Sequence, residues 1–142
     1  MNHIILRTAA RLLLPLLLVF SVFLLIRGHN LPGGGFVGGL LASAAYALHS
    51  LAYGIEASRR ALLFRPRALV GVGLLTALGS GLPALFVGRP LMTGLWLTLD
   101  GKDGLHLGTP LLFDIGVYLV VIGSTLMYVF GLQEPDASGD AQ

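Results

Sequence analysis

The chain has 142 residues, of which 55% are hydrophobic and 11% are charged, and its formal net charge is +2. A soluble domain of this size needs a polar surface that so few polar side chains cannot cover, so the composition excludes a soluble globular protein. The sequence contains no cysteine, which excludes disulfides and thiolate metal sites, and we expect no nucleic-acid partner.

Stretches without a fixed charge predict where the chain crosses a membrane. Charged side chains are absent from residues 12–26, 28–55, 68–88 and 115–133. An apolar helix needs roughly 20 residues to cross the hydrocarbon core of a bilayer. We therefore predict an all-α integral membrane protein with a single domain at 1–133 and a flexible acidic tail at 134–142. The four transmembrane helices are expected at about 8–27, 35–54, 68–88 and 110–132.

The first expected span has the shortest uncharged stretch, since 15 residues are too few for a hydrocarbon core of ~30 Å. Arg11 must then extend toward the lipid headgroups while the preceding turn continues the helix. A removable signal peptide is the alternative, because Arg7 and Arg11 precede the apolar stretch. The segment SVFLLIRGHN has no small-x-small cleavage pattern, so we expect the span to be retained.

The segment GHNLPGGGFVGG, residues 28–39, follows the first span and holds six of the twenty glycines. Gly33, Gly35 and Gly38 match the dinucleotide-binding pattern G-x-G-x-x-G. That pattern must follow a strand in a sheet-forming unit, so we exclude nucleotide binding here. We predict instead a turn at the outer mouth of a helical bundle, in which Pro32 ends the helix and the glycines permit positive φ. Irregular backbone at this depth requires close protein neighbours or a watery vestibule.

The second span carries small residues four positions apart, at Gly35, Gly39, Ser43 and Ala47. They form one stripe on a helix, and in lipid such a stripe lets two backbones approach closely, so we predict a packing face. His49 lies near the inner end of this span. We expect a neighbouring helix to satisfy its hydrogen bonds, with a role in a proton relay as the alternative.

The distribution of basic residues predicts the orientation. With four spans, the N-terminus, the loop at 56–67 and the C-terminal tail share one side. That side carries Arg7, Arg11, Arg59, Arg60, Arg65 and Arg67, and the other carries Arg27, Arg89 and Lys102. We therefore expect both termini in the cytoplasm. The arginines around Phe64 can contact anionic lipid or a neighbouring subunit, and we favour lipid.

The third span contains Pro83 near its outer end, where a kink or an early stop is expected. Residues 89–109 form the only sizeable connector, in which LWLTL and LHL flank the turn sequence DGKDG, a pattern that indicates a short β-hairpin. Such a hairpin needs support from a neighbouring subunit or from the membrane interface. The fourth span should begin near Pro110, with Thr109 as its cap.

Asp114 is an acid within an apolar segment, and such a residue suggests a functional ion pathway. A structural role is the alternative, because the N-terminal turn of a helix favours an anion and Arg27 should lie on the same side. His29 can titrate near neutral pH or bond the carbonyls of the glycine turn. The chain offers no H-E-x-x-H motif and no serine, histidine and aspartate arrangement, so we expect no enzymatic activity, no cofactor and no bound metal.

Three segments resemble the MnhB or MrpB small subunit of the bacterial multisubunit Mrp-type sodium/proton antiporters. They are GHNLPGGGFVGGLLASAAYAL, GRPLMTGLW and LGTPLLFDIGVYLVVIG, and the resemblance runs from about residue 7 to residue 132. The positions that match the family are Gly28, His29, Asn30, Pro32, Gly33, Gly34, Gly35, Phe36, Gly39, Pro110, Phe113, Asp114 and Gly116.

The resemblance implies an accessory subunit of a hetero-oligomer that exports Na+ in exchange for H+ across the cytoplasmic membrane. In that family the proton-translocating lysines and glutamates lie mainly in large subunits. This chain has neither residue type inside an expected span, in agreement with an accessory role near the sodium-handling region. A scaffold without ion contact is the alternative, and a self-sufficient channel is a third hypothesis.

Overall fold

The computed structural model describes residues 2–28, 32–90, 93–98 and 106–134, so the acidic tail expected at 134–142 lies outside the described residues except for Glu134. Within these residues, six helices and two short strands follow one another. They are α1 (Asn2–Arg27), α2 (Gly35–Tyr53), α3 (Ile55–Ala61), α4 (Pro66–Gly79), α5 (Leu82–Phe86), β1 (Trp96–Thr98), β2 (His106–Gly108) and α6 (Thr109–Gln133). Four helical segments are long and apolar enough to cross a membrane, which confirms the predicted all-α membrane class.

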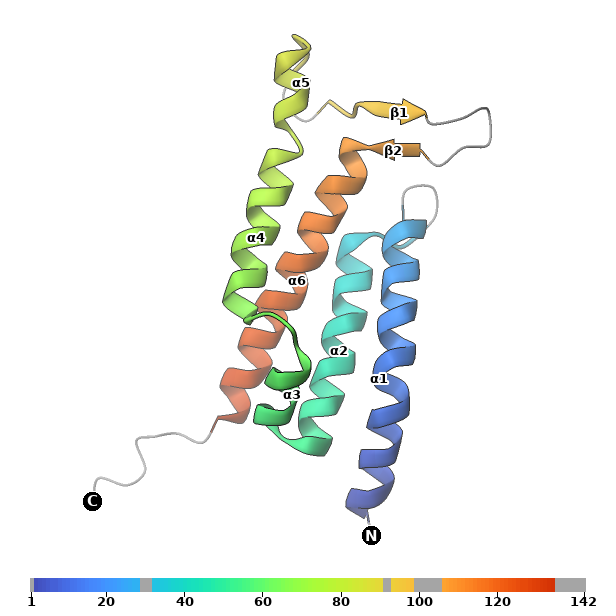
Figure 1. Cartoon of the computed structure of the whole chain (residues 1–142), viewed down its shortest axis with the longest axis vertical. Helices are drawn as coiled ribbons and strands as arrows, with labels where there is room; N and C mark the ends of the chain where they lie inside the picture. Colours follow the sequence, from blue (N-terminus) through green and yellow to red (C-terminus); the bar gives the residue numbers. More distant parts are fainter. Residues whose placement is uncertain (1, 29–31, 91–92, 99–105, 135–142) are drawn as a thin grey trace, which may run out of the picture.

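The four long helices stand side by side in one row, in the order α4, α6, α2 and α1 (Figure 1). Helix α6 packs against both α4 and α2, and α1 packs against α2. The beginning of α1 and the end of α6 lie at the same end of the row (Figure 1). The predicted bundle is therefore an open row, and the faces of α1 and α4 remain exposed in the isolated chain.

The first and third spans differ from the expected boundaries. Helix α1 begins at Asn2 and has 26 residues, so it reaches about 39 Å and is long enough to cross the hydrocarbon core. The third span is interrupted between α4 and α5, at residues 80–81, and Pro83 lies in the first turn of α5. Proline suits that position because a first-turn amide has no partner within the helix.

The loop expected at 56–67 contains the additional helix α3. Its buried Ser58 donates a hydrogen bond to the backbone oxygen of Tyr46 at 3.0 Å, which holds α3 against α2. Hydropathy did not reveal this helix, because a seven-residue segment is too short to give a clear period.

The expected hairpin region contains β1 and β2, which pair antiparallel with Trp96 opposite Gly108 and Thr98 opposite His106. The DGKDG turn between them lies outside the described residues. Pro110 lies in the first turn of α6, but the predicted cap at Thr109 is wrong. Thr109 is the first helical residue, and its hydroxyl accepts a hydrogen bond from the Leu95 amide at 3.0 Å, so it ties the connector to α6 instead.

Small residues lie where the central helices meet. A β-carbon at Gly39 would lie 2.9 Å from the β-carbon of Val121, so α2 and α6 approach closely there. On the other side of α6, a β-carbon at Gly73 would lie 2.7 Å from the backbone oxygen of Gly116. The buried hydrophobic core consists of Ala42, Leu69, Ile122, Leu126 and Phe130. In lipid, packing of this kind must supply the attraction between helices.

Candidate functional site

The glycine turn folds directly onto the end of α1. The backbone amides of Gly28 and Gly34 both donate to the backbone oxygen of Leu24, at 3.0 Å each. A β-carbon at Gly28 would lie 1.9 Å from the Gly34 nitrogen, and Gly34 has a φ of 92°. Both positions therefore require glycine, because one lacks space and the other has a backbone conformation that other residues rarely adopt.

Asp114, in the second turn of α6, lies against the beginning of α2. A β-carbon at Gly35 would lie 2.0 Å from the backbone oxygen of Asp114, and one at Gly34 would lie 3.5 Å from its Oδ2 atom. The half-buried carboxylate thus faces bare backbone at the N-terminus of α2. First-turn amides of a helix lack helical partners and carry partial positive charge, so this end of α2 favours the carboxylate.

A polar contact that the sequence analysis missed lies one turn farther along α6. The hydroxyl oxygens of Tyr118 and the fully buried Ser21 of α1 lie 2.8 Å apart. They meet across Gly38 of α2, where a β-carbon would lie 2.7 Å from the Ser21 backbone oxygen. Tyr118 follows Asp114 by four residues and so shares its helix face. This spacing is the feature of the sequence that could have pointed to Tyr118. We call Asp114, Tyr118, Ser21 and Gly38 the polar seam.

The other candidates around the turn have different positions. Arg27 is exposed at the end of α1, and its guanidinium carbon lies 5.9 Å from the centre of the Phe23 ring. Phe36 and Phe113 are also exposed. His29 and Asn30 lie outside the described residues.

His49 lies toward the opposite end of α2 from Gly35. Fourteen residues separate them, or about 21 Å along the helix, so the structure does not bring His49 to Asp114. The His49 ring stacks on Tyr53, with ring centres 4.8 Å apart. We expected a neighbouring helix to satisfy the hydrogen bonds of His49. Its buried Nδ1 atom, however, has no hydrogen-bond partner among the described residues.

The chemistry of the polar seam is limited to oxygen ligands and hydroxyl protons. Within the described part of the chain, no three histidine, cysteine, aspartate or glutamate side chains gather as a metal site would require. A carboxylate, two hydroxyls and helix-terminal backbone groups can bind or guide a small ion, since hard cations prefer oxygen ligands. They do not form a nucleophile with a general base.

Comparison with known proteins decides the family. The family profile described as a domain related to the MnhB subunit of Na+/H+ antiporter matches residues 5–127. The chain belongs to the MnhB family. The resemblance seen in the sequence is thereby confirmed, and the glycine turn and Asp114 both lie within the matched range.

Relatives of this MnhB-family chain are similar to it over nearly its whole length. It is 39% identical over 139 residues to the B subunit of the Na(+)/H(+) antiporter of Bacillus subtilis, covering 95% of this chain and 96% of that protein. It is 37% identical over 139 residues to the corresponding antiporter protein of Alkalihalophilus pseudofirmus, covering 95% of each.

A chain in the solved structure of the Mrp complex from a Dietzia species has the same fold. The TM-score is 0.82 at 34% sequence identity, and the similarity covers 99% of this chain. It covers only 15% of that larger chain, so the MnhB-family chain corresponds to one part of it.

Proposed function

We propose that this chain is an accessory membrane subunit of a multisubunit sodium/proton antiporter in a bacterial cytoplasmic membrane. The observation that carries the proposal is the match over 95% of the chain to the antiporter protein of Bacillus subtilis. A transport role also agrees with a site that offers oxygen ligands but no catalytic arrangement.

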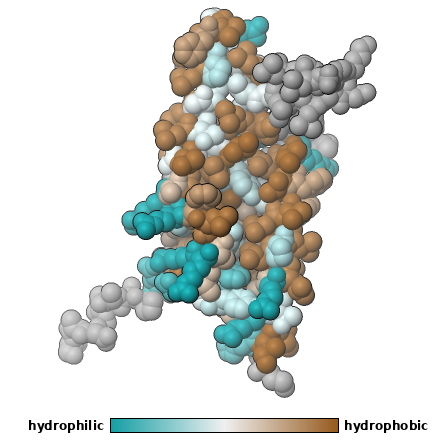
Figure 2. All heavy atoms as spheres, viewed as in Figure 1, coloured by the Kyte–Doolittle hydropathy of each residue, from teal (hydrophilic) through white to brown (hydrophobic). Residues whose placement is uncertain are grey.

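The open row of helices supports assembly with other subunits. Large apolar side chains are exposed along α1, among them Leu12, Val19, Phe20 and Phe23. Apolar side chains also cover much of the face seen in Figure 2. Lipid covers part of this surface, and we assign the remainder to other subunits of an Mrp-type complex. Arginines are more numerous at the end of the row that holds the termini than at the end that holds the glycine turn. By the positive-inside rule, the termini face the cytoplasm and the glycine turn faces outward.

At the outward end, we assign the polar seam to the sodium-handling region of the assembly. The carboxylate of Asp114 supplies the negative charge that attracts a cation, and the partial positive charge at the N-terminus of α2 favours that carboxylate. The scaffold alternative has its own support, because the backbone of Asp114 is also part of the tight contact with Gly35.

One experiment separates these two functions. Sodium-driven proton flux is measured in vesicles containing the full assembly, for the wild type and for Asp114→Asn, which keeps the backbone contact and removes the charge. Glu56→Gln, an exposed charge in α3, is the matched control. We expect Asp114→Asn to lower the flux while native gels show an intact complex and the control stays normal. Normal flux for Asp114→Asn would reject the ion-path role and leave the scaffold.

The third hypothesis is tested by expressing the chain alone. An isolated open row leaves apolar faces without partners. In the part of the chain that the structure describes, one span is interrupted, between α4 and α5, whereas many stand-alone carriers place a pair of broken helices around a central site. We expect vesicles that contain only this chain to show neither sodium nor proton flux. Flux in such vesicles would replace the accessory role with a self-sufficient channel.

A further inference from the structure

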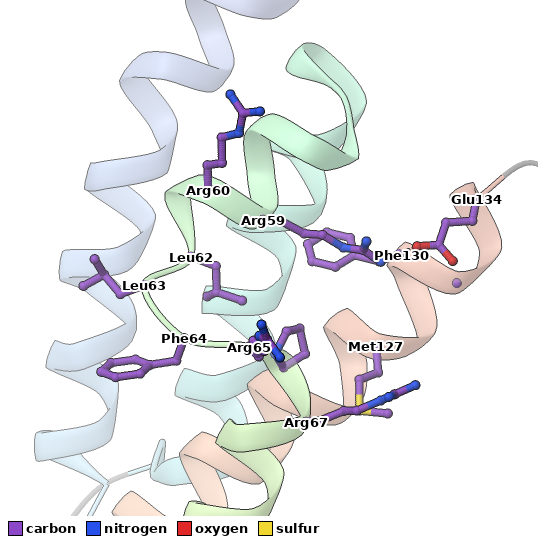
Figure 3. A pocket seen from close by; sticks show the side chains of 12 residues that line it. Arg59, Arg60, Leu62, Leu63, Phe64, Arg65, Arg67, Met127, Phe130 and Glu134 are labelled. Carbon is purple, nitrogen blue, oxygen red and sulfur yellow. Dashed lines mark hydrogen bonds and ion pairs between the residues drawn. The ribbon is translucent and has the colours of Figure 1, made fainter.

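A hollow of about 850 Å³ lies at the cytoplasmic end of the row, between the segment joining α3 to α4 and the end of α6. Four arginines contribute to its lining: Arg59, Arg60, Arg65 and Arg67. Figure 3 shows Arg59, Arg65 and Arg67 on the side of α6, near Met127 and Phe130, whereas Arg60 extends away from them. Hydrophilic side chains also gather toward this end in Figure 2. The hollow therefore joins a basic side to an apolar side.

Among the residues that line it, all of them described, the hollow carries more positive than negative charge. Arg59 pairs with Glu134 and lies over the ring of Phe130, with its guanidinium carbon 5.7 Å from the ring centre. Among the described residues, Arg60, Arg65 and Arg67 form no ion pair. Four arginines and one glutamate leave a net charge of +3. An anionic ligand complements that charge, and a guanidinium group is well suited to binding phosphate through two parallel hydrogen bonds.

The apolar part of the hollow indicates where this anion comes from. Leu63 and Phe64, between the arginine pairs, are 88% and 64% exposed, and Met127 of α6 is also exposed. Helix α4 begins at Pro66 and α6 ends at Gln133, so the hollow lies where two spans leave the hydrocarbon. Exposed apolar side chains beside arginines at this level are stabilised by acyl chains below a layer of headgroups.

We propose that this hollow binds an anionic phospholipid, with the headgroup phosphate held by Arg65 and Arg67 and an acyl chain lying against Met127. The ligand is a lipid because the site combines positive charge with exposed apolar surface at headgroup depth. A free phosphate would contact only the charged part of the site. The inference requires only that the four helices cross the membrane, so it stands independently of the sodium-handling role.

The test uses the complete assembly, purified in detergent and stripped of lipid. Binding of phosphatidylglycerol, phosphatidylcholine and inorganic phosphate is measured by titration, and assembly is checked on native gels. We expect the wild type to bind phosphatidylglycerol in preference to the other two probes. Arg65→Gln combined with Arg67→Gln should weaken phosphatidylglycerol binding roughly 30-fold, from the contribution of two arginines near an anionic surface. Equal binding of phosphatidylcholine or of inorganic phosphate would overturn the proposal.

Two further variants guard against effects on folding. Arg11→Gln removes an exposed arginine of α1 outside the hollow. This variant should weaken phosphatidylglycerol binding by less than about fivefold. Glu134→Gln removes the acid of the hollow and should strengthen phosphatidylglycerol binding by about fivefold, a gain that misfolding cannot produce. Unchanged binding in both the double arginine variant and Glu134→Gln would overturn the proposal.

A photo-crosslinking side chain at position 127 identifies the occupant in the native membrane. We expect a lipid adduct. An adduct to another subunit alone would show that a protein fills the hollow, and would overturn the proposal.

Discussion

Ser21 of α1 and Tyr118 of α6 join two helices that are separated by α2 in the row, with their hydroxyl oxygens 2.8 Å apart. The contact is possible because Gly38 of α2 has no side chain between them. The Ser21 hydroxyl donates a hydrogen bond to the backbone oxygen of Leu18 at 2.9 Å. The hydroxyl pair thus links α1 to α6 across α2, one turn along α6 from Asp114.

We expect Tyr118→Phe to lower the free energy of unfolding by about 0.6 kcal/mol, the average for a hydrogen bond between membrane helices. Ser21→Ala should have a similar effect, and the double variant should lose less than the sum of the two. Tyr128→Phe is the control, because Tyr128 is 72% exposed. Unfolding of the purified assembly in a denaturing detergent measures all four. Strict additivity of the Ser21 and Tyr118 effects would contradict a direct bond.

Close contact between α2 and α6 predicts a strong effect at Gly35. A β-carbon there would lie 2.0 Å from the backbone oxygen of Asp114 and 3.0 Å from the Tyr118 nitrogen, so Gly35→Ala forces the two helices apart. Gly71→Ala is the matched control, because a β-carbon at Gly71 of α4 meets nothing within 4 Å. Native gels should show loss of the complex for Gly35→Ala alone. Gly71→Ala should be neutral or stabilising by up to about 1 kcal/mol, since alanine is the better helix former.

An intact complex with Gly35→Ala would mean that α2 and α6 can separate without loss of assembly. The packing role given to this end of α2 would then be wrong.

Much of the fold could be predicted because a bilayer imposes simple requirements on the chain. Long uncharged stretches indicated four spans, and the clustered glycines indicated the turn between α1 and α2. The order of the helices in the row could not be predicted, since an apolar helix in lipid presents no polar face that marks its exposed side. The contact between Gly73 and Gly116 determines where α4 packs. Gly116 stands out only as a position that matches the family, and Gly73 does not stand out among twenty glycines.

The candidate site was predictable only in part. Asp114 is identified by its charge within an apolar segment, but its position beside Gly34 depends on how α6 docks against α2. Ser21 and Tyr118 are ordinary residues in membrane helices, and only the tertiary structure brings them together.

Gly34 and Gly54 offer a matched pair that separates strain from function. Their φ values are 92° and 91°, a region that side chains avoid, so alanine at either position should cost about 1–3 kcal/mol. A β-carbon at Gly34 would lie 3.5 Å from Asp114 Oδ2, whereas one at Gly54 meets nothing within 4 Å. We therefore expect both variants to lower the thermal stability of the assembly, and only Gly34→Ala to change the sodium concentration at half-maximal flux. An equal change in sodium dependence for Gly54→Ala would show that the effect arises from stability.

His49 allows a test of the proton-relay alternative at the other end of α2. Its ring stacks on Tyr53 with centres 4.8 Å apart, and its buried Nδ1 atom has no hydrogen-bond partner among the described residues. His49→Phe preserves an aromatic ring in the stack and removes the buried nitrogen, whose desolvation costs about 1–3 kcal/mol when no partner is present. We expect the variant to be at least as stable as the wild type and to keep normal sodium-driven proton flux. A stable, assembled His49→Phe complex that no longer moves protons would instead establish His49 as part of a relay, because only the loss of a titratable group would then account for the defect.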